Sequence, residues 1–272
     1  MSTILDKITA YKKQEVAQRS ALYPTKLLEQ SIYFETPTVS MCQFLKREDK
    51  QGIIAEFKRQ SPSKGAINPY AKVEEVSIGY MQAGASALSV LTDTHFFGGK
   101  NEDLTEARTF NYAPILNKNF IIDEYQIVEA KSIGADVILL IAECLEKKRL
   151  QELAAFAKQL GMEVLMELHT REQLDKLCPE VDMVGVNNRN LKTFEVDLNN
   201  SLAIAEQLPS ELIKVAESGI SNPETVVMLK QHGFEGFLIG EHFMRHGRPQ
   251  EACAKFIQQV INLSEKALVY ES

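Results

Sequence analysis

Short apolar runs rich in β-branched residues recur along the chain between residues 52 and 240. The runs cover residues 52–57, 87–92, 113–117, 136–142, 163–168, 183–187, 213–218 and 236–240. Amphipathic stretches of helical length separate several of them, at residues 73–83, 123–132, 146–159 and 223–231. Apolar runs of this length that alternate with helical stretches predict successive βα units.

A glycine stands between several of the predicted helices and the next strand. The glycines in this place are Gly84, Gly134, Gly161 and Gly233. Glycine adopts the left-handed conformation that ends a helix, so each one predicts a helix stop before a new strand. The repeated units predict a fold of the α/β class, a closed (β/α)8 TIM barrel. An open doubly wound sheet is the competing fold, but it usually has about five or six strands and a glycine-rich first turn, which is missing here.

Residues 1–48 do not follow this alternation of strands and helices. Residues 4–17 predict a charged amphipathic helix, and Pro24 and Pro37 interrupt the segment after it. We expect residues 1–48 to be an N-terminal helical extension packed on the barrel, with one mouth as a candidate position. Residues 1–272 are then expected to form a single domain, since a barrel of this kind needs about 250 residues.

Composition narrows the class of function. The chain has 30 basic and 37 acidic side chains, and this balance argues against a nucleic-acid binder, which usually shows a basic face. The cysteines form no close pair, so neither a zinc site nor a disulfide framework is predicted. They are Cys42, Cys144, Cys178 and Cys253. With neither a signal segment nor an apolar run of about 20 residues, we expect a cytoplasmic protein without a membrane span.

Charged and amide side chains gather where the predicted strands end. They are Glu56, Lys58, Lys118, Glu167, Asn187, Arg189 and Glu217. The carboxyl ends of all strands meet at one mouth of a barrel, where active sites of this fold lie. Alternate residues share a face, so Glu56 and Lys58 should point into the mouth and Phe57 outward. Burying these groups costs free energy, which favours a catalytic site or an anionic ligand over the alternative of a structural ion-pair network.

The residues after the last two predicted strands indicate a phosphate-binding site. Ser218 and Gly219 come after one strand and Gly240 ends the other, before helical segments that begin near Asn222 and Glu241. Backbone N–H groups at these positions can approach an anion, and barrels often bind phosphate there. One such glycine alone is more often a turn. The pair predicts a phosphate site, with Arg189 and Lys58 available to complete the positive charge.

Aromatic and histidine side chains near the strand ends are harder to assign. Phe97 and Phe120 could sandwich an aromatic ring of a ligand, with core packing as the alternative. His95 and His169 are expected to be structural.

The segment EFKRQSPS, residues 56–63, resembles the E-x-K-x-x-S-P-S signature of the indole-3-glycerol phosphate synthase family of the tryptophan pathway. Further matches occur in order: LTDTHFFGG (91–99), NKNFIIDEYQI (117–127), LMELHT (165–170), VGVNNRNL (184–191), VAESGI (215–220) and FLIGEHFM (237–244). The resemblance spans essentially the whole chain. Asn119 and Gln60 depart from the family, where Asp and Lys are frequent, at positions that do not carry the main proton transfers.

The resemblance implies a carboxy-lyase that converts 1-(2-carboxyphenylamino)-1-deoxyribulose 5-phosphate to indole-3-glycerol phosphate, without metal or cofactor. It implies that Lys118 is the general acid of ring closure and that Glu167 is a catalytic carboxylate. It also implies that Lys58 holds the substrate carboxylate and is a further candidate acid. Supporting catalytic positions are Glu56, Asn187 and Glu217. Substrate-binding positions are Ser61, Phe97, Phe120, Arg189, Ser218, Gly219, Gly240 and Glu241. A small phosphorylated molecule is the expected partner, and the protein is expected to be a monomer.

The residues themselves leave other functions open. A Schiff-base aldolase would use Lys118 as a nucleophile in an apolar pocket. Phosphoribosylanthranilate isomerase would share the phosphate site but should not need residues 56–63. A barrel retained only for binding should lack the charged strand ends, which are present here. For Lys118 we expect a balanced pKa, because a nearby lysine would lower it and opposing carboxylates would offset that shift.

Overall fold

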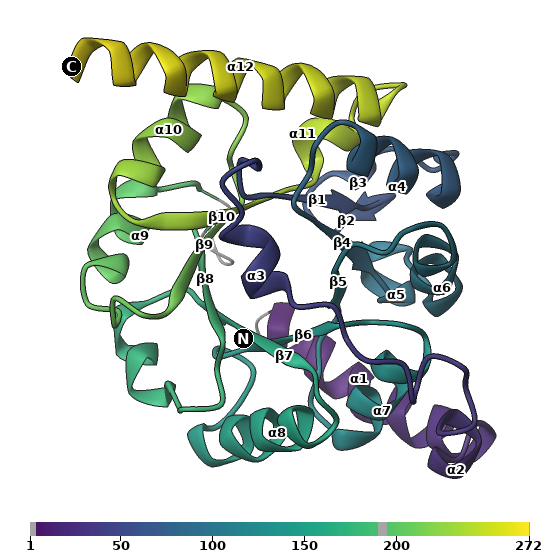
Figure 1. The fold of residues 1–272 in the computed structure, drawn as a ribbon. Helices are drawn as coiled ribbons and strands as arrows, with labels where there is room; N and C mark the ends of the chain where they lie inside the picture. Colours follow the sequence, from purple (N-terminus) through teal and green to yellow (C-terminus); the bar gives the residue numbers. More distant parts are fainter. Residues whose placement is uncertain (1–3, 190–194, 272) are drawn as a thin grey trace.

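The computed structural model describes residues 4–189 and 195–271, and Figure 1 shows their arrangement. Parallel strands close into a barrel in the order β1, β10, β9, β8, β7, β6, β5, β4. The strands are β1 (Ile53–Phe57), β4 (Ala87–Leu91), β5 (Ile115–Lys118), β6 (Val137–Ile141), β7 (Glu163–Leu168), β8 (Met183–Asn187), β9 (Ile213–Glu217) and β10 (Phe234–Ile239). The predicted (β/α)8 barrel of the α/β class is confirmed.

Helices surround the barrel (Figure 1). The longer ones are α4 (Val73–Gln82), α6 (Asn101–Phe110), α7 (Glu124–Ser132), α8 (Lys147–Gln159), α9 (Leu198–Ala205), α10 (Pro223–Gln231) and α12 (Pro249–Glu271). The N-terminal extension contains α1 (Ile4–Leu22), α2 (Thr25–Leu28) and α3 (Met41–Leu45). Short elements come after several strands: the β2 (Gln60–Ser61) and β3 (Gly65–Ala66) hairpin, α5 (Thr94–Phe97), the 3₁₀ helix η1 (Arg171–Lys176) and α11 (Glu241–Met244).

Neighbouring residues of β1 face opposite layers of the core. Ile53 and Phe57 belong to the outer layer between strands and helices. Ile54 belongs to the cluster inside the ring, and Glu56 lines a cavity at the end of the ring. The prediction that Glu56 points into the mouth and Phe57 outward is confirmed, as the two-residue period of a strand requires.

The helix α3 closes the end of the barrel at which the strands begin. Its Met41 and Leu45 pack with the apolar cluster inside the ring. Glu163, the first residue of β7, accepts hydrogen bonds from the backbone N–H groups of Met41 and Cys42 at 2.7 and 3.1 Å. Figure 1 shows α3 at the centre of the barrel. This mouth is the one that contributes stability in barrels of this kind.

The helix α1 lies at the opposite mouth, where its Ile4, Leu5 and Ile8 line the cavity. The extension therefore reaches both mouths, whereas the sequence suggested one. The expected end of this helix at residue 17 is wrong. Arg19 pairs with Glu129 of α7 at 2.7 Å, and this contact supports a further turn that the local pattern does not reveal.

Two strands differ from the sequence prediction by more than one residue at an end. The strand expected at 113–117 begins at Ile115, because Pro114 has no N–H for strand pairing, and it continues to Lys118. The strand expected at 236–240 begins at Phe234, where a register shift against β9 hides the pattern.

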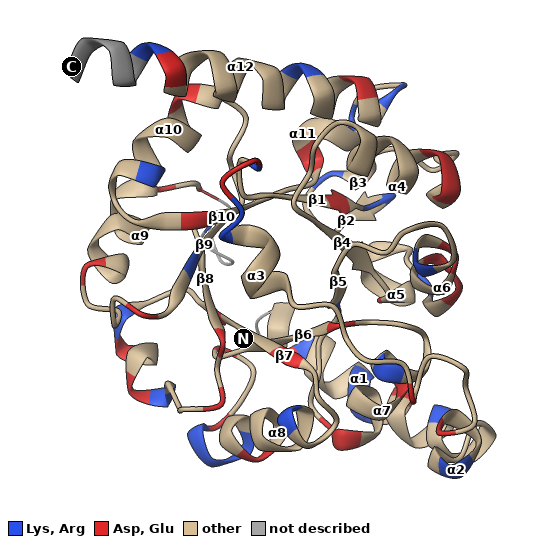
Figure 2. Cartoon of the chain, viewed as in Figure 1, with Lys and Arg blue, Asp and Glu red and all other residues tan. Residues whose placement is uncertain are grey.

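Charges of both signs are interspersed over the outer helices (Figure 2). Within the described ranges 4–189 and 195–271, no helix combines the length and the apolar character needed to cross a membrane.

Gly52 directly precedes β1, at the end of the barrel where the strands begin. Its φ is +76°, and a Cβ there would lie 2.0 Å from the carbonyl oxygen of Glu235. We expect Gly52→Ala to lower the free energy of unfolding by about 2–4 kcal/mol, because a left-handed backbone and a clash with main chain act together. Urea unfolding would measure the change.

Gly161 provides the matched control for Gly52. Its φ is +73°, but no heavy atom lies within 4 Å of the Cβ position. Gly161→Ala should therefore show the backbone strain alone, about 1 kcal/mol. Equal losses in the two variants would contradict a role for the contact with Glu235.

Candidate active site

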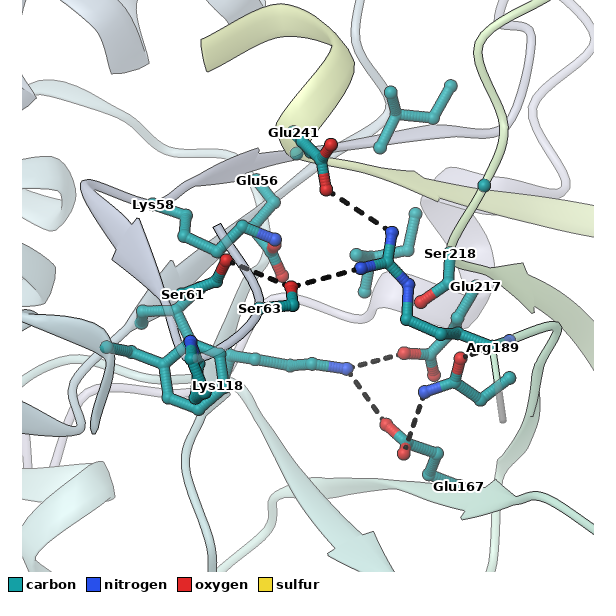
Figure 3. Close-up of a pocket in the computed structure, with 18 of the residues that line it drawn as sticks. Glu56, Lys58, Ser61, Ser63, Lys118, Glu167, Arg189, Glu217, Ser218 and Glu241 are labelled. Carbon is teal, nitrogen blue, oxygen red and sulfur yellow. Dashed lines mark hydrogen bonds and ion pairs between the residues drawn. The ribbon is translucent and has the colours of Figure 1, made fainter. Parts of the chain in front are cut away.

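A cavity of about 320 Å³ opens at the carboxyl ends of the strands, and Figure 3 shows part of its lining. Every residue that the sequence predicted for the site lines this cavity. They are Glu56, Lys58, Ser61, Phe97, Lys118, Phe120, Glu167, Asn187, Arg189, Glu217, Ser218, Gly219, Gly240 and Glu241. Their placement agrees with the prediction, and their chemical roles stay predictions.

Lys118 is the last residue of β5, and its ammonium group lies between two carboxylates (Figure 3). Nζ is 2.5 Å from Glu217 Oε2 and 3.1 Å from Glu167 Oε2. Asn187 Nδ2 donates to the other oxygen of Glu167 at 3.1 Å. The ends of β5, β7, β8 and β9 thus join in one network.

The expected balance in the pKa of Lys118 is wrong. Burial lowers this pKa, but the carboxylates of Glu217, Glu167 and Glu56 raise it, and the result lies well above the ordinary value. Lys58 is instead occupied by Glu56, with Nζ 2.8 Å from Oε1. Because the second lysine already has its own carboxylate, it does not offset the others, and Lys118 stays an ammonium ion.

The two carboxylates around Lys118 differ in protonation. For Glu167, burial raises the pKa, but Lys118, His169 and Asn187 hold it well below its usual range. For Glu217, burial raises the pKa, Lys118 opposes this, and the charges of Glu167 and Glu56 help bring it to about 7. The site therefore holds one fixed carboxylate and one that exchanges its proton near neutral pH.

The raised pKa of Glu217 predicts a pH-dependent stability. The folded protein keeps this proton up to about pH 7, while the unfolded chain releases it near pH 4.3, so the associated stability is present below about pH 4.3 and lost through pH 7. We expect Glu217→Gln to remove this loss. The free energy of unfolding of the variant, minus that of the wild type, should rise by about 2 kcal/mol between pH 5 and pH 8.

Urea unfolding at several pH values would test this expectation. The pKa of Glu167 is lowered rather than raised in the folded protein. The stability that Glu167 contributes is therefore fully present above about pH 4.3 and does not change between pH 5 and pH 8. Curves for variant and wild type that stay parallel from pH 5 to pH 8 would show that Glu217 is ionised throughout.

Glu56 is held by its surroundings at the end of β1. Its Oε2 accepts a hydrogen bond from Ser89 at 3.3 Å, and Oε1 pairs with Lys58. A Cβ at Gly240 would lie 2.4 Å from this Oε1. Glycine at position 240 therefore leaves the room that the carboxylate of Glu56 needs.

The loop after β9, where the sequence predicts an anion site, has an unusual backbone conformation. Ser218 and Gly219 have φ of +68° and +73°, and within the described part of the chain Ser218 is the one residue other than glycine with a positive φ. Asn188 Nδ2 donates to the carbonyl of Ser218 at 2.8 Å and holds this conformation. Strained backbone of this kind is concentrated at functional sites.

Arg189 extends over the cavity from the end of β8 (Figure 3). Nη1 donates to Ser63 Oγ at 3.2 Å, and Nη2 lies 3.3 Å from Glu241 Oε2. The guanidinium is thus directed toward the loops after β1 and β10. The side chain of Glu241 faces a cation rather than an anion, so any contact of residue 241 with phosphate would come from its main chain.

Apolar side chains form a further part of the lining, and Phe97 and Phe120 are called the apolar wall. The rings of Phe97 and Phe120 are 5.9 Å apart at an angle of 38°. Further apolar lining comes from Ile4, Leu5, Ile8, Leu139 and Ile141. The sequence missed the α1 contribution, because an amphipathic pattern predicts an apolar face without saying what it covers.

The contact between His169 and Glu167 was also not predicted from the sequence. Nε2 of His169 lies 3.1 Å from Glu167 Oε1, and the His169 side chain is buried. Burial lowers the pKa of His169, but Glu167 and its neighbouring carboxylates raise it overall. The alternation of side chains along β7 could have indicated this contact, since residues 167 and 169 lie on the same face when the extended backbone continues by one residue.

Across the described residues, no three or more His, Cys, Asp or Glu side chains are grouped so that they could hold a metal ion.

Comparison with known proteins gives consistent matches. A family model described as indole-3-glycerol phosphate synthase matches residues 5–257. The chain is similar to an indole-3-glycerol phosphate synthase from Bacteroides thetaiotaomicron, with 47% identity over 260 residues that cover 96% of this chain and 100% of that protein. A synthase of the same name from Salinibacter ruber is 44% identical over 256 residues, which cover 93% of this chain and 94% of the relative.

Solved structures with low sequence identity share the fold. A chain of the tryptophan synthase a2b2 complex from Pyrococcus furiosus matches with a TM-score of 0.57 and 15% identity, covering 79% of this chain and 99% of that chain. At this low sequence identity, the match shows a shared barrel fold and carries no information about function.

Proposed function

The chain belongs to the indole-3-glycerol phosphate synthase family, and on this basis we propose which residues carry its reaction. The enzyme converts 1-(2-carboxyphenylamino)-1-deoxyribulose 5-phosphate to indole-3-glycerol phosphate as a carboxy-lyase of tryptophan biosynthesis. One observation supports the cavity as the place of reaction. A single space joins an apolar wall, an ammonium group between carboxylates and a strained glycine-containing loop.

The three parts of the cavity match the three parts of the substrate. The aromatic ring fits the apolar wall at Phe97 and Phe120, where edge or offset packing of rings is favourable. The phosphate fits the loops at Ser218, Gly219 and Gly240, with Arg189 nearby. The ribulose chain then spans the cavity between them and passes Lys118.

Lys118 acts as the general acid in ring closure. The ring carbon that bears the carboxylate attacks the C2 carbonyl of the ribulose chain, and the carbonyl oxygen must receive a proton as the bond forms. An ammonium ion with a raised pKa remains protonated for this step. It can still donate, because the oxygen becomes an alkoxide, which is a stronger base than an amine. A positioned general acid contributes about 10²–10⁴ in rate.

Lys58 and Glu167 act in the later steps. Lys58 holds the substrate carboxylate until the bond to CO2 breaks and its electrons restore the aromatic ring. The hydroxyl formed from the carbonyl then leaves as water, with a proton from a lysine, while Glu167 accepts the proton released from the neighbouring carbon. In the free enzyme the charge of Lys118 holds the pKa of Glu167 low and keeps this carboxylate ionised. Once Lys118 has given up its proton, that charge is gone and Glu167 becomes a stronger base. CO2 and water are thereby both accounted for.

The Schiff-base alternative is disfavoured by the state of Lys118. A nucleophilic lysine must be a neutral amine, which needs a lowered pKa. Glu217, Glu167 and Glu56 act in the opposite direction.

The test is incubation of the purified protein with the synthetic substrate. We expect equal amounts of CO2 and indole product, and the product fluorescence is not masked because the chain contains no tryptophan. Borohydride reduction during turnover should leave no adduct on Lys118. Absence of indole, together with a trapped adduct, would favour the aldolase instead.

We further propose that the enzyme works as a monomer in the cytoplasm on this small phosphorylated molecule. The net charge of −7 and the mixture of charge signs over the outer helices support a protein that does not bind nucleic acid. Sedimentation at micromolar concentration would test the monomer.

A further inference from the structure

Lys12 of α1 is a fully buried charged residue that the proposed reaction does not use. Its side chain is 1% exposed, and its Nζ lies 2.8 Å from Asp93 Oδ2 and 2.5 Å from Glu15 Oε2. Lysine is almost never fully buried unless it is paired, because removing its charge from water is costly. Leu5 and Ile8 already bury an apolar face of the same helix, so packing alone does not account for Lys12.

Asp93 connects this ion pair to the short helix that carries Phe97. Its Oδ1 accepts hydrogen bonds from the backbone N–H groups of Phe96 and Phe97 at 2.7 and 3.0 Å and so caps α5. The side chain of Asp93 is fully buried. One oxygen of this carboxylate therefore faces Lys12 of α1, while the other fixes the backbone of Phe97.

Aromatic contacts join the same two helices next to the ion pair. Tyr11 stacks on His95 with ring centroids 4.3 Å apart, and it meets Phe96 edge-on at 5.7 Å. α1 and α5 thus share a junction made of a buried charge pair and stacked rings. Ile8, one turn from Lys12 on α1, and Phe97 of α5 both line the cavity.

We propose that Lys12 is a positioning residue for substrate binding: through Asp93 it fixes α5, so that Phe97 stands against Phe120 and α1 is seated over the cavity. The inference rests on the proposed function, in which this wall receives the aromatic ring of the substrate. Among the described residues that line the cavity, neither Lys12 nor Asp93 is present, so both act through Phe97 and α1.

The experiment compares Lys12→Met with the wild type, using the substrate and an analogue whose keto group is reduced to an alcohol and cannot be attacked. The dissociation constant of the analogue and KM should rise about tenfold, the size of one lost aromatic packing contact, while kcat changes less than threefold. Phe97→Ala should do the same. Because part of the effect of Lys12 passes through Phe97, the double variant should lose less binding than the product of the two single losses.

Two further variants separate positioning from general support of the fold. Arg19→Ala breaks another ion pair of α1, to Glu129, away from α5, and should leave KM unchanged. If Lys12→Met fails to fold because Asp93 is left unpaired, Lys12→Met with Asp93→Asn removes both charges and keeps the cap oxygen. This pair should fold and still bind the analogue about tenfold more weakly.

The outcomes distinguish the two proposals. A wild-type protein without turnover would defeat the proposed function. With turnover intact, an unchanged dissociation constant in the Lys12 variants would overturn the positioning role, even if their melting temperatures fall. Full additivity of Lys12→Met and Phe97→Ala would overturn it as well.

Discussion

Replacement of Lys118 by methionine is expected to lower kcat by about 10²–10⁴, the contribution of a positioned general acid. Methionine has nearly the same length and flexibility but carries no proton to donate. The phosphate loops and the aromatic wall are made by other residues, so binding should persist. The dissociation constant of the reduced substrate analogue should therefore change only a few-fold. Single-turnover measurements of indole formation would give the loss in the chemical step.

Lys148→Met is the matched control for this loss. Its side chain is 89% exposed on α8 and contacts Glu152 at 3.9 Å, so kcat should stay at the wild-type value. Near-normal turnover by Lys118→Met would remove Lys118 from the role of acid. A large loss of analogue binding would instead assign Lys118 mainly to holding the substrate.

The convergence of the site could be predicted because the fold determines where strands end. Glu56 and Glu217 are far apart in sequence, yet each lies at the end of a barrel strand, and all such ends meet at one mouth. The direction of each side chain could be inferred from the two-residue period of a strand. Local pattern and topology therefore sufficed for placement.

The electrostatic state of the site could not be predicted, because it depends on which charges pair. The sequence contains two lysines near the mouth, and one was expected to lower the pKa of the other. In the fold Lys58 is paired with Glu56, and Lys118 faces Glu167 and Glu217. Such pairing depends on distances of a few ångströms across the barrel, which no local pattern contains.

The positions of the N-terminal helices were likewise beyond the sequence. The sequence predicted an amphipathic helix at residues 4–17 within a helical extension over residues 1–48, but not which contacts hold the extension. The helix α1 contacts the segment of α5 at one mouth, and α3 contacts Glu163 at the opposite mouth. Contacts between segments this distant in sequence are determined only when the whole core has formed.

The second large effect is expected for Glu167→Gln, which keeps the shape of the side chain and removes its ability to accept a proton. Overall turnover should fall by about 10²–10⁴. If Glu167 is the base of the dehydration step, ring closure and loss of CO2 should be affected less than the departure of water. The variant should then release CO2 faster than it forms indole, and a hydroxylated ring-closed intermediate should accumulate.

Rapid-quench measurement of both products in a single turnover would test this order of steps. Glu172→Gln is the matched control, because Glu172 is exposed on η1 close in sequence to Glu167. Its CO2 and indole should appear together at wild-type rates. In Glu167→Gln, CO2 and indole that slow by the same factor would place this carboxylate in ring closure instead, beside Lys118. That result would fit the 3.1 Å contact between the two groups in the free enzyme and would leave the final proton to Glu217, whose pKa of about 7 suits a base.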